Sequence, residues 1–310
     1  MAQIGYGEAN GKVILIGEHA VTFGQPAIAI PFTTGKVKVT ITALAQDNPS
    51  YIHSDVYDGQ LSDAPEHIKA VISRFIAQHQ IDNPIDVEFE TNLPPSRGLG
   101  SSAAMAIAFI RASYDYLKQT LTNEQLIEEA NWAERIAHGK PSGIDTQTIV
   151  SNKPVWFHQG KVTTLKSLNL DGYMVVIDTG VKGSTKQAVE DVHQLCNQDA
   201  TYMSYIEHIG QLVYEANDAI EHHDFNQLAH VFTLAQDNLR KLTVSHDNIE
   251  ALLEMCKHQG ATAGKLTGGG RGGSMIILAQ NLDIAEKVAM AAEKFGAHHT
   301  WIENLGGQRD

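Results

Sequence analysis

Residues 93–104 read LPPSRGLGSSAA, a glycine-rich segment between a stretch that we expect to be extended and a long apolar helical pattern. Gly98 and Gly100 lack the side chains that would keep a backbone away from a ligand. The helical pattern begins at Ser101, and the first N–H groups of a helix have no partner inside it. Because such a helix start attracts anions, we expect phosphate to bind here. The Ser102 hydroxyl is placed to complete the coordination of a magnesium ion.

Three interpretations of this segment compete. Gly98, Gly100 and Ala103 also match the GxGxxA fingerprint of dinucleotide-binding folds, and residues 85–91 before them alternate as a strand should. That fold needs an acidic residue about 20 positions further on, at the end of a second strand, whereas Asp115 belongs to the same helical run. A P-loop needs a lysine after Gly100, which this sequence does not have. A plain strand-to-helix turn stays open, so the other motifs must decide.

Composition limits the class of protein. The length of 310 residues favours two domains, and a hydrophobic fraction of 43% is typical of globular proteins. Apolar runs such as residues 103–110 are too short to span a bilayer, and residues 1–11 lack the pattern of a signal peptide, so we expect a cytoplasmic protein without a membrane partner. The net charge of -13 argues against nucleic acid as a partner. Cys196 and Cys256 are expected to be ordinary helical residues, without a disulfide.

Hydrophobic spacing and turn residues predict the order of the elements. Extended segments are expected over residues 12–16, 35–45, 85–91, 261–266, 274–279 and 298–302, and a hairpin over 154–165 turning at Gln159 and Gly160. Helices are expected over residues 65–78, from Ser101, over much of 185–259 and over 284–295. Thr122 and Gln125 form a capping box for one further helix, which ends at Gly139 and Pro141 and carries Glu134 in its final turns.

Two more segments place polar side chains at the ends of elements. Residues 11–21 read GKVILIGEHAV, with Lys12 at one end of a strand and Glu18 and His19 at the other. Residues 134–145 read ERIAHGKPSGID, in which two carboxylates flank a Pro-Ser-Gly turn that could bring them towards one site. Taken singly, a solvated lysine, a tight turn and a surface helix charge explain these residues as well as a functional site does.

Together with KLTGGGRGGSM at residues 265–275, these segments stand in the order found in the GHMP family of small-molecule kinases. The resemblance covers nearly the whole chain. Within the family, GEHAVTFGQPAIA at residues 17–29 and HGKPSGID at 138–145 are most similar to the enzymes that act on mevalonate. The resemblance implies a two-domain α+β fold. The domain over residues 1–167 would be similar to the second domain of ribosomal protein S5, and that over 168–310 would be ferredoxin-like, its final segment returning to the first domain.

The resemblance also implies roles in phosphoryl transfer from ATP to mevalonate. Asp145 would accept or orient the proton of the substrate's primary hydroxyl, and Lys12 beside it would neutralise charge on the oxygen and on the moving phosphoryl group. Ser102 and Glu134 would hold the Mg²⁺ that bridges the β- and γ-phosphates. The residues that would bind ATP are Pro95, Ser96, Arg97, Gly98, Leu99, Gly100, Ser101, Ser102 and Ala103.

The residues that would contact the substrate are Glu18, His19, Thr185 and Gly269. His19 would donate a hydrogen bond to a substrate oxygen, and Glu18 would orient Lys12 or its neighbours. For Thr185, a role for it or Ser184 as a helix N-cap is an equal alternative. The run over 268–273 would close beside the phosphates, and Arg271, which interrupts the glycines, would touch phosphate or point to solvent.

The family also suggests a homodimer. The rival hypotheses are a family member acting on another small alcohol or its phosphate, such as phosphomevalonate, a non-catalytic metabolite sensor on the same fold, and a dinucleotide-dependent oxidoreductase. Comparing activity on a panel of substrates would identify a family member that acts on another alcohol. Ligand binding without ADP release would identify a sensor.

Overall fold

The computed structural model describes residues 3–139 and 142–306, which form two compact units. The first unit comprises Met1–Gly11, Gly35–Pro94 and Gly100–Asn152, and the second comprises Lys12–Thr34, Pro95–Leu99 and Lys153–Asp310. Strands β1 (Ile4–Ile16) and β2 (Ala27–Ala43) contribute residues to both units. Each unit is therefore discontinuous in the chain, and the division into 1–167 and 168–310 stays a prediction.

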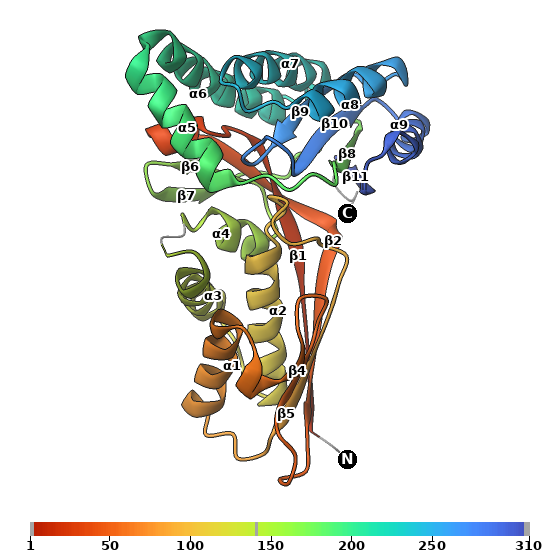
Figure 1. Ribbon diagram of the computed structural model, residues 1–310. Helices are drawn as coiled ribbons and strands as arrows, with labels where there is room; N and C mark the ends of the chain where they lie inside the picture. Colours follow the sequence, from red (N-terminus) through yellow and green to blue (C-terminus); the bar gives the residue numbers. More distant parts are fainter. Residues whose placement is uncertain (1–2, 140–141, 307–310) are drawn as a thin grey trace. The chain divides into compact units, whose positions relative to one another are not determined.

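In the first unit, helices lie on one side of the strands (Figure 1). Strand β5 (Ile85–Thr91) pairs antiparallel with residues 37–43 of β2 and parallel with β3 (Tyr51–His53), which pairs antiparallel with β4 (Asp58–Gln60). The alternating burial of Val37, Val39 and Ile41 follows the predicted pattern, because every second side chain points into the core. Besides β1 and β2, the elements are β3 (Tyr51–His53), β4 (Asp58–Gln60), η2 (Leu61–Asp63), α1 (Glu66–Gln78), β5 (Ile85–Thr91), α2 (Ser101–Tyr116), α3 (Asn123–His138) and α4 (Ile144–Ser151).

Two glycines let α2 lie directly against β1. A Cβ on Gly5 would stand 2.3 Å from the carbonyl oxygen of Ala112, and one on Gly7 would stand 2.1 Å from that of Ala108. Any larger residue would push the helix away from the strand. This contact fixes the helix whose first turn belongs to the predicted phosphate loop.

The predicted capping box of α3 is confirmed. The Gln125 N–H donates to the Thr122 hydroxyl at 3.2 Å, and the Thr122 N–H donates to the Gln125 side chain at 3.0 Å. The helix ends before Gly139, at the predicted place, while Pro141 lies outside the described residues. Glu134 accordingly lies in the last turns of α3.

The second unit contains a four-stranded antiparallel sheet. Its strands stand in the order β11 (His299–Asn304), β8 (Tyr173–Asp178), β10 (Ser274–Ala279) and β9 (Ala263–Thr267). Its strands and helices follow one another as β8, four helices, β9, β10, α9 and β11, which is the β-α-β-β-α-β succession of ferredoxin-like folds with extra helices in the first crossover. The expected ferredoxin-like architecture is confirmed. These elements are β8 (Tyr173–Asp178), α5 (Thr185–Gln198), α6 (Ala200–Glu221), α7 (Phe225–Lys241), α8 (Asp247–His258), β9 (Ala263–Thr267), β10 (Ser274–Ala279), α9 (Leu282–Phe295) and β11 (His299–Asn304).

The predicted hairpin also belongs to this unit. Strands β6 (Val155–His158) and β7 (Lys161–Thr164) pair antiparallel, and β6 pairs with residues 27–29 of β2. Gln159 and Gly160 both have positive φ, at 50° and 78°, as a two-residue hairpin turn requires. A short 3-10 helix, η1 (Ala20–Phe23), follows the strand β1.

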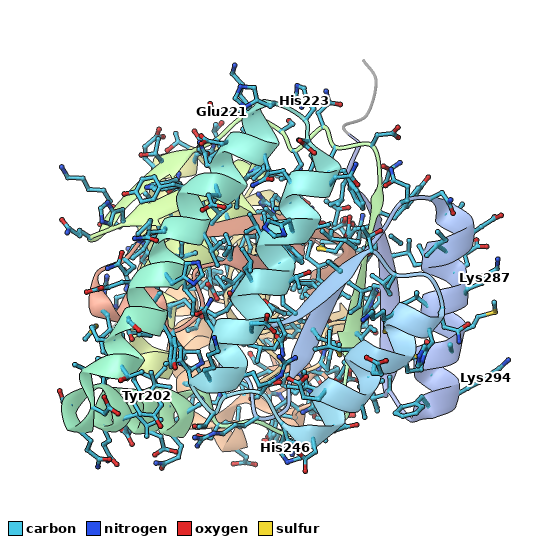
Figure 2. The ribbon with its side chains drawn as sticks, turned by 90° about the horizontal axis from the view of Figure 1, so that it is seen from above. Tyr202, Glu221, His223, His246, Lys287 and Lys294 are labelled. Carbon is cyan, nitrogen blue, oxygen red and sulfur yellow. The ribbon has the colours of Figure 1, made fainter. Side chains whose placement is uncertain are left out.

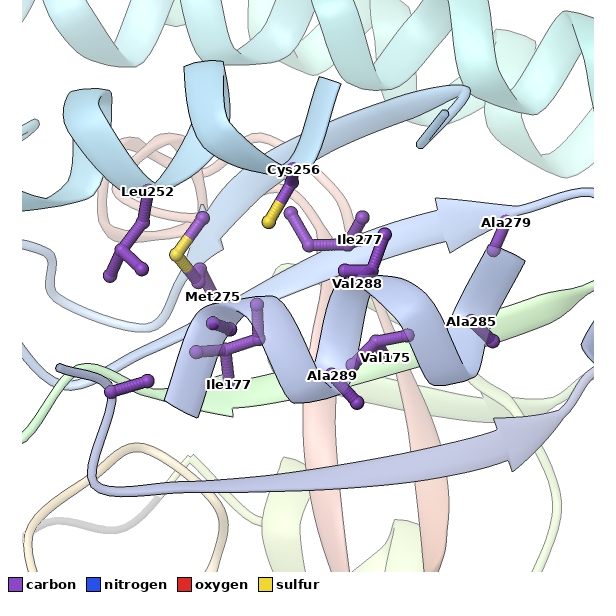
Figure 3. Close-up of a cluster of buried hydrophobic side chains, with 12 residues drawn as sticks. Val175, Ile177, Leu252, Cys256, Met275, Ile277, Ala279, Ala285, Val288 and Ala289 are labelled. Carbon is purple, nitrogen blue, oxygen red and sulfur yellow. The ribbon is translucent and has the colours of Figure 1, made fainter. Parts of the chain in front are cut away.

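Helices α8 and α9 cover one face of the ferredoxin-like sheet (Figure 3). Leu252 and Cys256 of α8 and Val288 of α9 are buried in one cluster with Ile277 of β10. Lys287 and Lys294 project from the opposite side of α9 (Figure 2). Both cysteines are free and buried in helices, as expected. Within residues 3–139 and 142–306, no helix combines the length and apolar character that a membrane crossing requires.

Candidate active site

The predicted phosphate loop has the backbone of an anion-binding segment. Gly98 and Gly100 adopt φ of 77° and 72°, a left-handed region that glycine enters without strain. Helix α2 begins at Ser101, as predicted, with Gly100 as its N-cap. Glycine has no side chain to cap the helix, and the N-cap position makes no side-chain hydrogen bond to the first turn of α2, a helix start of the kind that favours an anion.

The side chain of Arg97 anchors this loop to the rest of its unit. Its Nε lies 3.0 Å from Asp178, which is fully buried at the end of β8, and its two terminal nitrogens donate to the carbonyls of Val181 and Gly180 at 2.7 and 3.1 Å. The guanidinium is therefore held by protein groups. The predicted contact of Arg97 with ATP stays a prediction.

Lys12 lies beside the same loop. Its backbone N–H donates to the carbonyl of Leu99 at 2.9 Å, and the residue is 6% exposed. The sequence placed Lys12 at one end of a strand, whereas β1 already begins at Ile4 and Lys12 lies within it, buried next to the predicted phosphate-binding segment. The expectation that Lys12 stands next to Asp145 joins residues of different units and stays a prediction.

His19 is a neutral, buried side chain of the turn after β1. Its Nε2 lies 3.0 Å from the carbonyl oxygen of Gly269, and burial lowers the pKa of His19 to about 4. Because a carbonyl only accepts, the single proton of the neutral ring stands on Nε2. The other nitrogen, Nδ1, is buried and finds no hydrogen-bond partner among the described residues. With Nε2 donating to Gly269, the remaining ring nitrogen can only accept, so the predicted donation from His19 to a substrate oxygen does not fit this geometry.

Glu18, which the sequence suggested would orient Lys12 or its neighbours, forms its ion pair with Lys265 of β9. Both side chains are almost completely buried, with exposed fractions of 1% and 0%. Lys265 was missed from the sequence, although a lone charge in the strand AGKLT, directly before a glycine run, was a signal.

The glycine run over residues 268–273 contacts two other predicted segments of its unit. A Cβ on Gly98 would lie 3.6 Å from the Cα of Gly268, so a side chain on Gly98 would already contact the second glycine loop. A Cβ on Gly269 would lie 2.7 Å from the Oγ1 of Thr185, which places the predicted threonine against the run. The N-cap of α5 is Ser184, whose hydroxyl accepts from the Gln187 N–H, so the alternative that Ser184 or Thr185 caps this helix is confirmed for Ser184.

Arg271 is partly buried, and its guanidinium is bound by other residues of its unit. Its guanidinium forms an ion pair with Asp191 of α5 and donates to the carbonyl of Thr243 at 3.3 Å. The two alternatives for this residue, contact with phosphate or exposure to solvent, stay predictions. Arg271 links the glycine run to α5, through a contact with Asp191, which lies 80 positions earlier in the chain.

Three further predicted residues, Ser102, Glu134 and Asp145, belong to the first unit, whereas Pro95 and Ser96 belong to the second. The Ser102 hydroxyl of α2 donates to Glu134 of α3 at 2.6 Å, and Glu134 is 7% exposed. Asp145 lies in the first turn of α4, where a helix N-terminus favours a negative side chain. Gly143, with φ of 79°, allows the sharp entry into that helix. The three helices that carry these residues pack on one another.

Comparison with known proteins assigns the family. Models of the GHMP kinase N-terminal and C-terminal domains match residues 66–152 and 216–298. Mevalonate kinase of Aeropyrum pernix is 32% identical over 282 residues, which is 87% of each chain. The chain belongs to the mevalonate kinase family.

Two solved mevalonate kinases agree with that assignment. The structure from methicillin-resistant Staphylococcus aureus MRSA252 is 59% identical and has a TM-score of 0.84, covering 98% of this chain and all of its own (100%). Mevalonate kinase of L. major, solved in complex with R-mevalonate, is 25% identical with a TM-score of 0.82, over 97% of this chain and 94% of its own. The dinucleotide oxidoreductase hypothesis is therefore excluded.

Proposed function

We propose that this chain transfers the γ-phosphate of ATP to the 5-hydroxyl of mevalonate, giving 5-phosphomevalonate for isoprenoid biosynthesis. The observation that carries the proposal is the 59% identity with a mevalonate kinase that covers 98% of the chain. The polar residues that such a transfer needs lie in ordered elements: Lys12 within strand β1, Ser102 and Asp145 in the first turns of α2 and α4, and Glu134 in the last turns of α3.

In the proposed reaction, the phosphates of ATP bind the backbone N–H groups at the start of α2. Asp145 takes the proton of the 5-hydroxyl as its oxygen forms a bond to the γ-phosphorus, and the bond from that phosphorus to the bridging oxygen of ADP breaks. Lys12 stabilises the negative charge that develops on the attacking hydroxyl oxygen and on the phosphoryl group being transferred. His19 Nδ1 accepts a hydrogen bond from a substrate hydroxyl, and Thr185, Glu18 and Gly269 shape the substrate site.

We further propose that Ser102 and Glu134 hold the Mg²⁺ ion that accompanies ATP. Their oxygens stand 2.6 Å apart, and hydroxyl and carboxylate oxygens are the ligands that this hard cation prefers. Among the described residues, no group of three or more His, Cys, Asp or Glu side chains is gathered for a metal. Mg²⁺ would thus depend on few protein ligands and on the phosphates, whose charge it neutralises.

Glu134→Gln is expected to raise the Mg²⁺ concentration for half-maximal velocity by at least about tenfold, because an amide replaces the only proposed carboxylate ligand. Titrating velocity with Mg²⁺ at fixed ATP measures this. Glu128→Gln, on an exposed position of the same helix, is the matched control and should keep the wild-type requirement. A wild-type Mg²⁺ dependence in Glu134→Gln would remove Glu134 from the metal site.

The proposed setting is the cytoplasm, and a homodimer is the assembly that the family suggests. Size-exclusion chromatography with light scattering tests the second point: a mass close to twice 33.8 kDa supports the dimer, and a mass of 33.8 kDa contradicts it.

The substrate is tested by following ADP formation with mevalonate, phosphomevalonate, galactose and homoserine. We expect kcat/KM for mevalonate to exceed that for each of the others by orders of magnitude. Preference for phosphomevalonate would assign the chain a different reaction in the same family. Binding of mevalonate without ADP formation, in protein that also binds ATP, would identify a sensor.

A further inference from the structure

A buried ion pair connects the turn after β1 to strand β9. The Lys265 ammonium contacts the Oε1 of Glu18 and donates to the carbonyl of Leu266 at 2.8 Å. Its charge also stands 5.4 Å from the ring centroid of Phe232. Neither residue of the pair reaches solvent, so water does not stabilise either charge.

Two neighbouring contacts join the same two segments. The Thr267 hydroxyl donates to the carbonyl of Ile14 at 2.8 Å, and His19 donates from Nε2 to the carbonyl of Gly269 at 3.0 Å. The side chains of Lys265 and Thr267 therefore bind the end of β1 and the turn that follows it. His19 of that turn binds the start of the glycine run. Lys12 lies on the same strand, two residues before Ile14.

Stability alone does not explain an ion pair in this place. Burial raises the pKa of Glu18 and lowers the pKa of Lys265, and the attraction between the two side chains opposes both shifts. Replacing a buried pair by apolar residues of similar volume is often neutral or stabilising, whereas removing one partner is strongly destabilising. What the pair adds is a directed contact between two particular atoms, which an apolar pair does not supply.

We propose that Lys265 is a positioning residue for phosphoryl transfer. By pairing with Glu18 it holds the turn over residues 17–19 against the glycine run, so that Lys12 and His19 keep their orientation. It also cancels the charge of Glu18, which would otherwise repel the anionic phosphates and substrate carboxylate. The inference rests on the proposed function, because it assigns Lys265 to the same reaction.

The test separates stability from activity by comparing two variants. Glu18→Met/Lys265→Met replaces the pair by two unbranched apolar side chains, so it keeps the volume and loses the directed contact. We expect the double variant to melt within a few degrees of the wild type and to bind ATP with wild-type affinity. Its kcat should fall by about 30-fold or more, because displacement of a reacting group by about 1 Å can lower a rate by about 10².

Glu18→Gln is the opposite case. It leaves Lys265 without a counter-charge, so this variant should melt well below the double variant. The amide oxygen still accepts from the amine, so its loss of kcat should be smaller than that of the double variant. A positioning role thus predicts opposite orders of melting temperature and of kcat. If the variant with the lower melting temperature also has the lower kcat, Lys265 has no positioning role. The same conclusion follows if the double variant folds and keeps the wild-type kcat.

If the double variant does not fold, Thr267→Val is tested in its place. It removes only the hydroxyl that donates to Ile14, and a threefold or larger fall in kcat at unchanged ATP affinity is expected; an unchanged kcat would then overturn the proposal. Lys257→Met, on an exposed position of α8, is the control for loss of a lysine. A wild type that forms no ADP from mevalonate would refute the proposed function instead, and the comparison would be repeated with whichever substrate is phosphorylated.

Discussion

Asp145→Asn is expected to lower kcat for mevalonate by about 10³-fold, near the middle of the range for loss of a general base. Asparagine keeps the size of the side chain but does not take up a proton. The alcohol would therefore attack while still carrying its hydrogen. Initial rates of ADP formation at saturating ATP and mevalonate measure the effect, and calorimetric titration should show that ATP affinity changes by less than about threefold.

A matched control for this substitution is Asp82→Asn, an exposed aspartate of the same unit. It should leave both kcat and ATP affinity at wild-type values. If Asp145→Asn keeps its turnover, Asp145 does not take the proton. If ATP affinity falls together with kcat, the carboxylate contributes to nucleotide binding and not to the transfer itself.

Lys12→Met is expected to lower kcat by about 10²- to 10³-fold, as for the loss of one group that stabilises transition-state charge. Methionine matches the length of the lysine stem, so the buried position stays filled while the ammonium is lost. The backbone contact to Leu99 does not depend on the side chain and should persist. Steady-state kinetics should therefore show a large fall in kcat with a modest change in KM for ATP.

Lys38→Met removes an exposed lysine from strand β2 and is the control for a general effect of net charge. It should retain wild-type kinetics. Should Lys12→Met raise only the KM for ATP, with kcat unchanged, Lys12 binds the nucleotide equally in ground and transition states and does not assist the transfer.

Local patterns were sufficient for much of the fold. The alternation over residues 85–91 predicts β5 with its observed ends, and the capping box at Thr122 fixes the start of α3. Strand β8 was not predicted, because a short, continuously apolar run has no period that separates strand from helix. Helix α4 was also missed: Thr146, Thr148 and Ile149 are β-branched, a type that favours strands, and packing against α2 and α3 overrides that preference.

The candidate site was predictable where its chemistry lies in consecutive residues. The glycines of the phosphate loop, the Gly-Glu-His turn and the Ser102 hydroxyl were read from short motifs. The partners of charged side chains were not, because they depend on segments far apart in the chain. Glu18 meets Lys265 across 247 positions, and Arg97 meets Asp178 across 81. The proton position on His19 likewise required the carbonyl of Gly269 to be located first.

Lys12 and Asp145 are proposed to act on one hydroxyl in one transfer step, and a kinetic double-mutant cycle measures this most directly. Rates of ADP formation are compared for the wild type, Lys12→Met, Asp145→Asn and the variant that carries both substitutions. If the two groups work as a unit, the double variant should be no more than about threefold slower than the slower single variant. A double variant whose loss equals the product of the two single losses would contradict a shared step.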